Sequence, residues 1–425
     1  MTNLTIRFDD VRDRVVRVID TADGVRVPIY LVRDLRGRVR LSVSDEFEDD
    51  TPVRNALRDI GVALHETLGA YGYPADEAIL FIEPVLLERL RLDAREVRSG
   101  VFWVDRLVTG SAWWTVGSPD PNRRDKRFTL YSVKGGVGRS TTAAVLARHL
   151  AAGGERLLVV DLDLESPGLS SALIEPEARP AFGVTDWFVE DLVGQGDQVI
   201  EAMTVVPAWA HDLDGEVRVV PAHGREPGEY LAKLGRVLMD VGDPWSLRLE
   251  RLLSRLEERC VPTIVLVESR SGLHDVAAAT VTDLDAQVLL FATDSDSTWT
   301  DYDVLFRHWQ RQGLATKIRK RLSMVSALTP ELDTARYLEG FSERSWDLFR
   351  HVYDAIPSCS DSDDAFSFDL DDNLAPHHPI AIHWSRGLAA GTSLRALEPT
   401  VVPQAYAGFL RWFDGLIAVD GEGAP

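Results

Sequence analysis

The chain has 425 residues, of which 45% are hydrophobic and 27% are charged, a composition typical of a protein with two or three globular domains. Its formal net charge of −21 opposes long-range attraction to nucleic acid, whose phosphates are also negative. No apolar run approaches the roughly 20 residues of a membrane span. The first residues lack a secretory signal pattern, and two cysteines offer no disulfide framework, so we expect a cytoplasmic protein with no membrane span.

Residues 1–116 predict a small α+β domain in which we recognise no family. Two runs rich in tryptophan, residues 102–104 and 112–116, predict a closing hairpin whose aromatic side chains lie in the core. Four earlier runs of alternating apolar residues predict strands: residues 4–8, 14–19, 25–33 and 39–43.

A helix is expected after the fourth strand, with Thr51 as its N-cap and Pro52 at its first position. The polar stretch 117–127 contains two prolines and predicts a linker, so that residues 128–425 form the second domain. Apolar residues of the helix repeat at helical spacing and predict one buried face: Val53, Leu57, Ile60, Leu64 and Leu68.

The most informative segment is the glycine-rich stretch at residues 133–141, Val-Lys-Gly-Gly-Val-Gly-Arg-Ser-Thr. It follows an apolar run, 128–133, and precedes residues 141–150 with helical apolar spacing, which together predict strand, turn and helix. Glycines allow close backbone approach, and amide N–H groups at a helix N-terminus attract anionic oxygens. The stretch therefore predicts a phosphate-binding loop with these nucleotide contacts: Lys134, Gly135, Gly136, Val137, Gly138, Arg139, Ser140 and Thr141.

This loop resembles the deviant Walker A motif of the ParA/MinD family of P-loop ATPases, in the SIMIBI class, and in particular its KGGVGR variant. Members of that family switch between a monomer and a sandwich dimer around ATP and Mg²⁺. The resemblance implies that Lys134 is catalytic and reaches the partner's ATP across the dimer interface. Arg139 stands where the common motif has lysine. Guanidinium and ammonium are not equivalent at a phosphate, so the sequence leaves turnover open.

A second resemblance to the family lies at the end of an apolar strand, residues 156–161, where the sequence runs Asp-Leu-Asp. The resemblance gives Asp163 the role of orienting the attacking water, since phosphoryl transfer depends on positioning and charge. It gives Asp161 a place in the Mg²⁺ shell or in the turn. The nearby Glu165 is expected to be an ordinary loop carboxylate.

The third resemblance is a strand at residues 263–268 that ends in an acid and is followed by glycine. The family usually has aspartate where this chain has Glu268, which the resemblance makes a Mg²⁺ partner together with Ser140. Gly272 would let the backbone approach the terminal phosphate. The alternative is a buried strand whose terminal acid only caps the turn.

Apolar strands alternate with amphipathic helices after residue 128 and predict an α/β fold, a doubly wound, mostly parallel sheet of the P-loop NTPase type. The nucleotide is expected at the carboxyl ends of the strands. No asparagine follows the expected strand at 288–293, so adenine and guanine are not distinguished. Residues 406–417 predict a core helix, because their polar face lacks the basic residues of a lipid-surface helix.

Together these patterns predict a molecular switch that binds ATP, hydrolyses it slowly to ADP and phosphate, and dimerises around ATP and Mg²⁺. Its output would pass through the N-terminal domain or a protein partner. The KGGVGR subgroup points to bacterial signalling or conflict systems, and nucleic acid is not expected as a partner. The alternative is a catalytically impaired nucleotide-binding scaffold or regulatory module, because Arg139 and Glu268 both depart from the family pattern.

Overall fold

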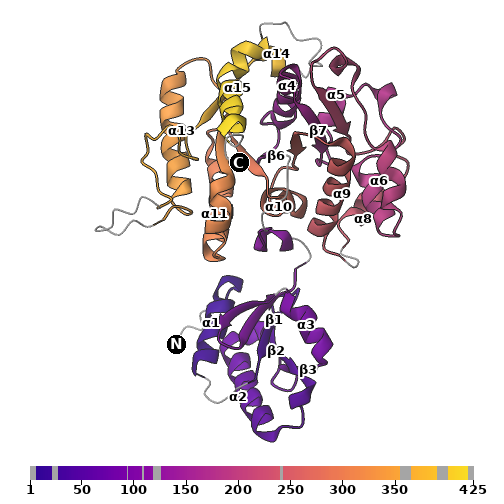
Figure 1. Ribbon diagram of the computed structural model, residues 1–425. Coiled ribbons are helices and arrows are strands. Elements are labelled where there is room, and N and C mark those ends of the chain that lie inside the picture. Colours follow the sequence, from indigo (N-terminus) through magenta and orange to yellow (C-terminus); the bar gives the residue numbers. More distant parts are fainter. Residues whose placement is uncertain are drawn as a thin grey trace. The chain divides into compact units, whose positions relative to one another are not determined.

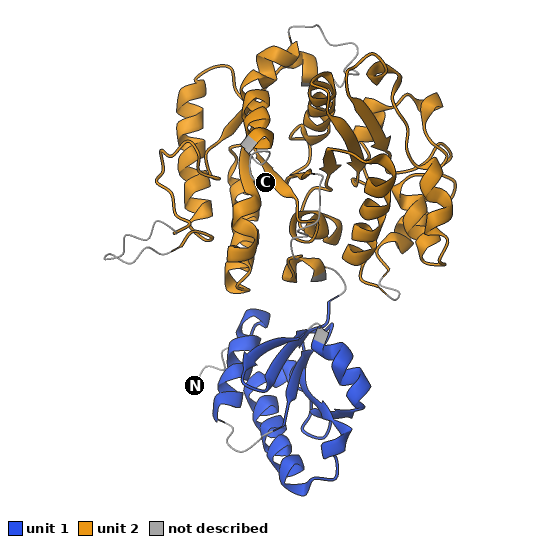
Figure 2. Cartoon of the chain, viewed as in Figure 1, with its two compact units in different colours: residues 1–109 blue, residues 110–425 orange. Residues whose placement is uncertain are grey.

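Two compact units, residues 1–109 and 110–425, make up the chain in the computed structural model (Figure 2). The structure describes residues 6–21, 27–92, 94–107, 110–117, 126–239, 243–354, 365–389 and 401–419. Within these ranges, no helix combines the length and the apolar content that crossing a membrane requires. Most of the predicted linker, residues 118–125, lies outside the described residues.

The first unit is built on a five-stranded mixed sheet in the order β3-β2-β1-β5-β4. Successive side chains of a strand point to opposite faces, so the sheet has two apolar layers. Helices α1 (Phe8–Thr21) and α2 (Thr51–Leu68) cover one face, and α3 (Pro84–Leu92) packs on the other. The strands are β1 (Ile29–Arg33), β2 (Val39–Ser44), β3 (Ile79–Ile82), β4 (Arg95–Arg98) and β5 (Val101–Asp105).

Two of the four predicted early strands agree with the structure only in part or not at all. The run at 14–19 is helical and belongs to α1, because Val11, Val15 and Ile19 recur every four residues and form its buried face. The run at 4–8 contains no strand among its described residues, 6–8, and residues 1–5 lie outside the described ranges. The runs at 25–33 and 39–43 contain β1 and β2, although residues 22–26 are not described.

The predicted N-cap of α2 is wrong by one residue. Asp50 caps the helix, and its carboxylate accepts a hydrogen bond from the backbone N–H of Val53 at 3.1 Å. Thr51 therefore begins the helix, and Pro52 lies in its first turn, where a missing N–H costs nothing. The predicted face is confirmed, since Leu57, Ile60, Leu64 and Leu68 are buried and Val53 is partly buried.

The predicted closing hairpin is wrong in its second half. Residues 102–104 lie in β5, but Ser111–Trp114 form a short 3-10 helix that belongs to the second unit. Trp113 is buried there between Tyr131 and Trp309, with ring centroids 6.0 and 6.2 Å apart. Burial of such a large apolar ring favours this packing over pairing with a distant strand.

The second unit, in which Figure 1 shows helices around a central sheet, is built on seven parallel strands. Their order is β12-β11-β10-β6-β9-β7-β8, which confirms the predicted α/β class. The chain leaves β6 towards β7 and β8, returns through β9, and then crosses to β10 on the other side of β6. Such a reversal opens a crevice at the carboxyl ends of the strands. The strands are β6 (Lys126–Tyr131), β7 (Arg156–Asp161), β8 (Glu216–Val220), β9 (Ile264–Glu268), β10 (Gln287–Ala292), β11 (Leu322–Thr329) and β12 (Ile380–His383).

Helices cover both faces of this sheet. On one face lie α4 (Arg139–Ala152), α5 (Leu169–Leu173) and α15 (Val401–Val419), and the burial of Tyr406, Phe409 and Phe413 confirms that the last helix is part of the core. The other face carries α6 (Val184–Asp191), α9 (Trp245–Cys260), α10 (Asp275–Thr282), α11 (Asp296–Arg311) and α13 (Thr334–Phe349). The remaining short helices are α7 (Gly196–Val199), α8 (Tyr230–Val237), α12 (Ala315–Ile318) and α14 (Arg386–Ala389).

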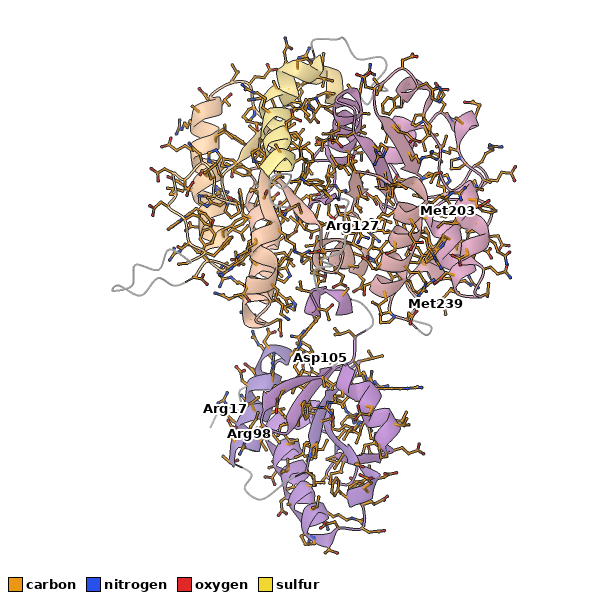
Figure 3. The ribbon with its side chains drawn as sticks, viewed as in Figure 1. Arg17, Arg98, Asp105, Arg127, Met203 and Met239 are labelled. Atoms are coloured by element: carbon orange, nitrogen blue, oxygen red, sulfur yellow. The ribbon has the colours of Figure 1, made fainter. Side chains whose placement is uncertain are left out.

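The strand that leads into the glycine-rich loop is tied to α9 by a buried arginine. The side chain of Arg127, labelled in Figure 3, is fully buried. Its Nη1 atom lies 2.6 Å from Glu250 Oε2, and its Nε atom lies 2.6 Å from Glu257 Oε1. Both carboxylates come from α9, so this network holds β6 and α9 together in one orientation.

Arg127→Met should lower the free energy of unfolding of the second unit by about 3 kcal/mol, because it leaves two partly buried carboxylates without their cation. Urea denaturation followed by far-ultraviolet circular dichroism measures the change. Arg307→Met is the control, because it removes an exposed pair with Asp303 and should change stability by less than about 1 kcal/mol. Equal destabilisation by both variants would contradict the role of Arg127.

Candidate nucleotide-binding site

The glycine-rich loop joins β6 to the N-terminus of α4. Gly136 and Gly138 have φ angles of 75° and 86°, a left-handed conformation that glycine adopts without steric cost. Gly138 is the N-cap of α4, and its carbonyl accepts the backbone N–H of Thr142 at 2.9 Å. The preceding amides at the start of this 14-residue helix have no helical acceptor, which makes the loop a site for anionic oxygens.

Arg139, the cation of the loop, lies inside the unit with only 6% of its surface exposed. Its Nη1 donates to the carbonyl of Ser269 at 2.7 Å, and its Nη2 lies 3.5 Å from Asp163 Oδ2. These partners follow β9 and β7 respectively, so the guanidinium bridges the carboxyl ends of two strands. The structure thus brings together the predicted phosphate cation and the acid predicted to orient water.

Ser140 and Glu268, two of the three residues predicted at Mg²⁺, are in direct contact. The hydroxyl of Ser140 donates to Glu268 Oε1 at 2.5 Å, and Glu268 is 1% exposed. The second carboxylate oxygen, Oε2, is buried and has no hydrogen-bond partner. A buried unpaired oxygen is costly, so this atom is suited to a proton or a metal ion.

Asp161, the third residue predicted at the metal, holds the turn after β7. Its Oδ2 accepts the backbone N–H and the hydroxyl of Ser170 at 2.9 and 2.6 Å. Its Oδ1 accepts the backbone N–H of Asp163 at 3.1 Å. Both oxygens are thereby engaged by the protein, and Asp161 orients the segment that carries Asp163.

The site has more buried negative groups than positive ones, because the carboxyl groups of Asp161, Asp163 and Glu268 lie near the guanidinium of Arg139. Burial, together with the charge of Asp161, raises the pKa of Glu268 to about 8, although Ser140 and Arg139 act in the opposite direction. Burial raises the pKa of Asp161 to about 6 despite its hydrogen bonds. Burial also raises the pKa of Asp163, against the lowering effect of Arg139. The site therefore favours an additional positive charge.

These side chains fit a magnesium ion that the nucleotide helps to hold. Mg²⁺ prefers oxygen ligands and usually takes one or two protein carboxylates together with phosphates and water. Ser140 Oγ and the unpaired Oε2 of Glu268 are oxygens of this kind. Within the described ranges, no group of three or more His, Cys, Asp or Glu side chains could hold a metal ion by itself.

The remaining predicted residues surround the loop. Lys134 Nζ lies 2.5 Å from Asp301 Oδ2, on α11, and the lysine side chain is 37% exposed. Gly272 has a φ angle of 84°, and its N–H donates to the carbonyl of Ser132 at 3.0 Å, just before the loop. Thr141 is half-buried in the first turn of α4.

Sequence reasoning missed three participants. The carbonyl of Ser269 accepts from Arg139, and Asp301 pairs with Lys134, although neither residue has a motif that would reveal it. Arg270 pairs with Glu165, which was predicted to be an ordinary loop acid. The only available signal was the position of Arg270 between Glu268 and Gly272.

Residues 128–338 match the family model described as the CobQ/CobB/MinD/ParA nucleotide binding domain. This part of the chain belongs to that family. The match confirms the predicted resemblance to ParA/MinD-type P-loop proteins, and the first unit lies outside it. A comparison with curated proteins finds no match.

Several solved structures resemble the chain at low identity. A putative plasmid partition protein from Borrelia burgdorferi B31, bound to AMPPNP, is 15% identical over 68% of this chain and 98% of its own, with a TM-score of 0.43. In the MinC:MinD complex from Aquifex aeolicus, the matched chain is 17% identical over 71% and 98%, with a TM-score of 0.42. Cobyrinic acid a,c-diamide synthase from Mycobacterium smegmatis, with an ATP analogue and magnesium, is 19% identical over 52% and 82%, with a TM-score of 0.39. Similarities this low assign no ligand or partner to this chain.

Arg139→Ala should weaken binding of a nucleoside triphosphate about tenfold, because one charge-assisted contact is lost in a buried site. Isothermal titration calorimetry with ATP and Mg²⁺ measures the affinity, and circular dichroism checks that the variant folds. Arg139→Lys keeps the charge and should lose less affinity. Unchanged affinity in Arg139→Ala would contradict the assignment of Arg139 as the phosphate cation.

Proposed function

We propose that the chain is an ATP-dependent switch that binds ATP and Mg²⁺ at residues 133–141, dimerises around them and slowly hydrolyses ATP to ADP and phosphate. The observation that supports this best is the convergence of three features at one edge of the sheet. These are the glycine loop at the start of α4, the buried Arg139–Asp163 pair, and the Ser140–Glu268 pair with its unpaired oxygen.

Each group has a distinct role in this proposal. Loop amides and Arg139 bind the phosphates, and Ser140 and Glu268 hold Mg²⁺, which neutralises phosphate charge when bound. Asp163, oriented by its contact with Arg139 and by the turn around Asp161, positions the attacking water. Catalysis then depends on placement and electrostatics, as is general for phosphoryl transfer.

Lys134 supports the dimeric part of the proposal. Arg139 already supplies a cation from within the loop, so a second cation at the start of the loop is redundant for one nucleotide. In this structure Lys134 pairs with Asp301 of α11 and remains partly exposed. A lysine in that position is free to exchange its partner for the triphosphate of a second subunit across a two-fold interface.

A catalytically impaired scaffold is the second candidate function, and two contacts favour it. The guanidinium of Arg139 is engaged by Ser269 and Asp163, which restrains both the cation and the acid. Glu268 is long enough to bond Ser140 directly. Such a site binds nucleotide but turns it over poorly. The switch and the scaffold therefore differ in hydrolysis and dimerisation, and agree in binding.

For the biological setting, we propose a cytoplasmic protein in bacterial signalling or conflict, whose nucleotide state is passed on by the first unit or by a protein partner. The net charge of −21 disfavours nucleic acid as that partner, since negative surfaces repel phosphate at long range.

Asp163→Ala should retain ATP binding and lose detectable hydrolysis, because positioning of water acts in the transition state and adds little to ground-state affinity. Phosphate release measures turnover, and calorimetry measures affinity. Asp197→Ala, which removes a mostly exposed acid from α7, is the control and should behave like the parent. Hydrolysis at the parental rate in Asp163→Ala would refute the role of this residue.

Lys134→Ala decides between the switch and the scaffold. The variant should bind AMPPNP with nearly parental affinity but remain monomeric, whereas the parent should dimerise, because a ligand shifts an equilibrium only by binding its two states differently. Light scattering with and without AMPPNP and Mg²⁺ gives the oligomeric state. Lys317→Ala, at an exposed position on α12, should dimerise like the parent. A parent that stays monomeric would favour the scaffold, and a variant that dimerises like the parent would refute the role of Lys134 at the interface.

A further inference from the structure

A short segment after β9, residues 269–272, lies directly against the phosphate loop. The N–H of Ser269 donates to the carbonyl of Leu130 at 3.1 Å, and the N–H of Gly272 donates to that of Ser132 at 3.0 Å. These two bonds join the segment to the end of β6 on either side of Arg270. The backbone therefore carries Arg270 to the edge of the loop.

A second observation also places residues 269–272 against the phosphate loop. A Cβ atom built on Gly135 would lie 3.7 Å from the hydroxyl oxygen of Ser271, an ordinary van der Waals contact. Ser271 is the next residue after Arg270. The segment thus reaches the glycines whose amides are suited to phosphate, which places a cationic residue beside them.

The side chain of Arg270 connects two loops. Its guanidinium pairs with Glu165, which follows β7, while Arg270 itself follows β9. Arg270 thus joins the loop after β9 to the loop that also carries Asp163, the carboxylate expected to face the terminal phosphate.

Arg270 is restrained less strongly than Arg139, the buried cation of the site. Arg139 is buried and bonded to Ser269, and is therefore committed to the interior. The side chains of Arg270 and Glu165 are 24% and 51% exposed. An ion pair with so exposed a carboxylate contributes little to stability. A guanidinium–phosphate contact is planar, often bidentate and stronger, so phosphate can compete successfully with Glu165.

We propose that Arg270 recognises the terminal phosphate of the bound nucleotide. It leaves Glu165 for that phosphate when a triphosphate binds, and it returns to Glu165 when only the diphosphate remains. The exchange separates the loop after β7 from the loop after β9, so the presence of the third phosphate changes how these two loops are joined. This inference rests on nucleotide binding at the proposed site, but on neither hydrolysis nor dimerisation.

The test compares affinities for AMPPNP and ADP, each with Mg²⁺, by isothermal titration calorimetry. Arg270→Ala should weaken AMPPNP binding about tenfold and leave ADP binding unchanged, because only the triphosphate makes the contact. Glu165→Gln should strengthen AMPPNP binding by up to about fivefold, since the competing ion pair is removed, and again leave ADP unchanged. Opposite effects from the two partners of one ion pair are not expected of a merely structural contact.

Arg259→Ala and Glu201→Gln are matched controls, because these residues form an exposed ion pair of 3.1 Å that involves the C-terminal end of α9. Both should bind the two nucleotides like the parent. Equal loss of AMPPNP and ADP affinity in Arg270→Ala, or no loss of either, overturns the inference. A parent that binds neither nucleotide overturns the proposed function and this inference together. A parent that prefers AMPPNP through Arg270 but neither dimerises nor hydrolyses ATP refutes the switch and supports the inference.

Discussion

The site depends on the buried contacts that the guanidinium of Arg139 makes with two strand ends. This guanidinium is the buried cation among three buried carboxyl groups, and its two partners come from different strand ends: the carbonyl of Ser269 after β9 and the carboxylate of Asp163 after β7. A buried charge needs a partner and satisfied hydrogen bonds. The loop, the strand ends and the acid therefore have one mutually compatible arrangement, and each of them restrains the others.

The excess of buried carboxyl groups makes the site favourable for an added cation. The raised pKa values of Glu268 and Asp161 show that the folded chain disfavours full ionisation there. An incoming cation relieves that cost, and an unpaired oxygen of Glu268 is available to it. In the proposed function, triphosphate and metal ion complement each other in such a place, because the ion would meet the acids while the loop amides and Arg139 would meet the phosphates.

The charged groups at this edge of the sheet form two sets, which differ in how tightly the protein holds them. Arg139, Asp161 and Glu268 are almost fully buried and form a fixed framework. Lys134 and Arg270 are partly exposed, and each pairs with a carboxylate on another element, Asp301 and Glu165 respectively. Exposed pairs are weak and exchange partners readily. The proposed switch requires both sets, because the buried groups would hold the phosphates and the partly exposed groups would respond to them.

The sequence alone determined the nature of the second unit. Glycines at 135, 136 and 138 between a strand and a helix are typical of a phosphate-binding loop. Apolar strands that alternate with helices predict a parallel sheet covered on both faces. The acids at the ends of the strands, Asp161, Asp163 and Glu268, can also be recognised in the sequence, because each of them follows an apolar run. These patterns are local, so neighbouring residues in the sequence are enough to reveal them.

Only the tertiary structure decided which distant residues meet. The run at 14–19 is helical although its sequence predicts a strand, because a window of six residues holds too few repeats to separate periods of 2 and 3.6. Trp113 was placed in the wrong unit because the burial of an aromatic ring depends on the cavity available, here between Tyr131 and Trp309. The contacts of Arg139 with Ser269, of Lys134 with Asp301 and of Arg270 with Glu165 join residues more than 100 positions apart. No spacing along the chain encodes such pairs, because the order of strands in the sheet brings them together.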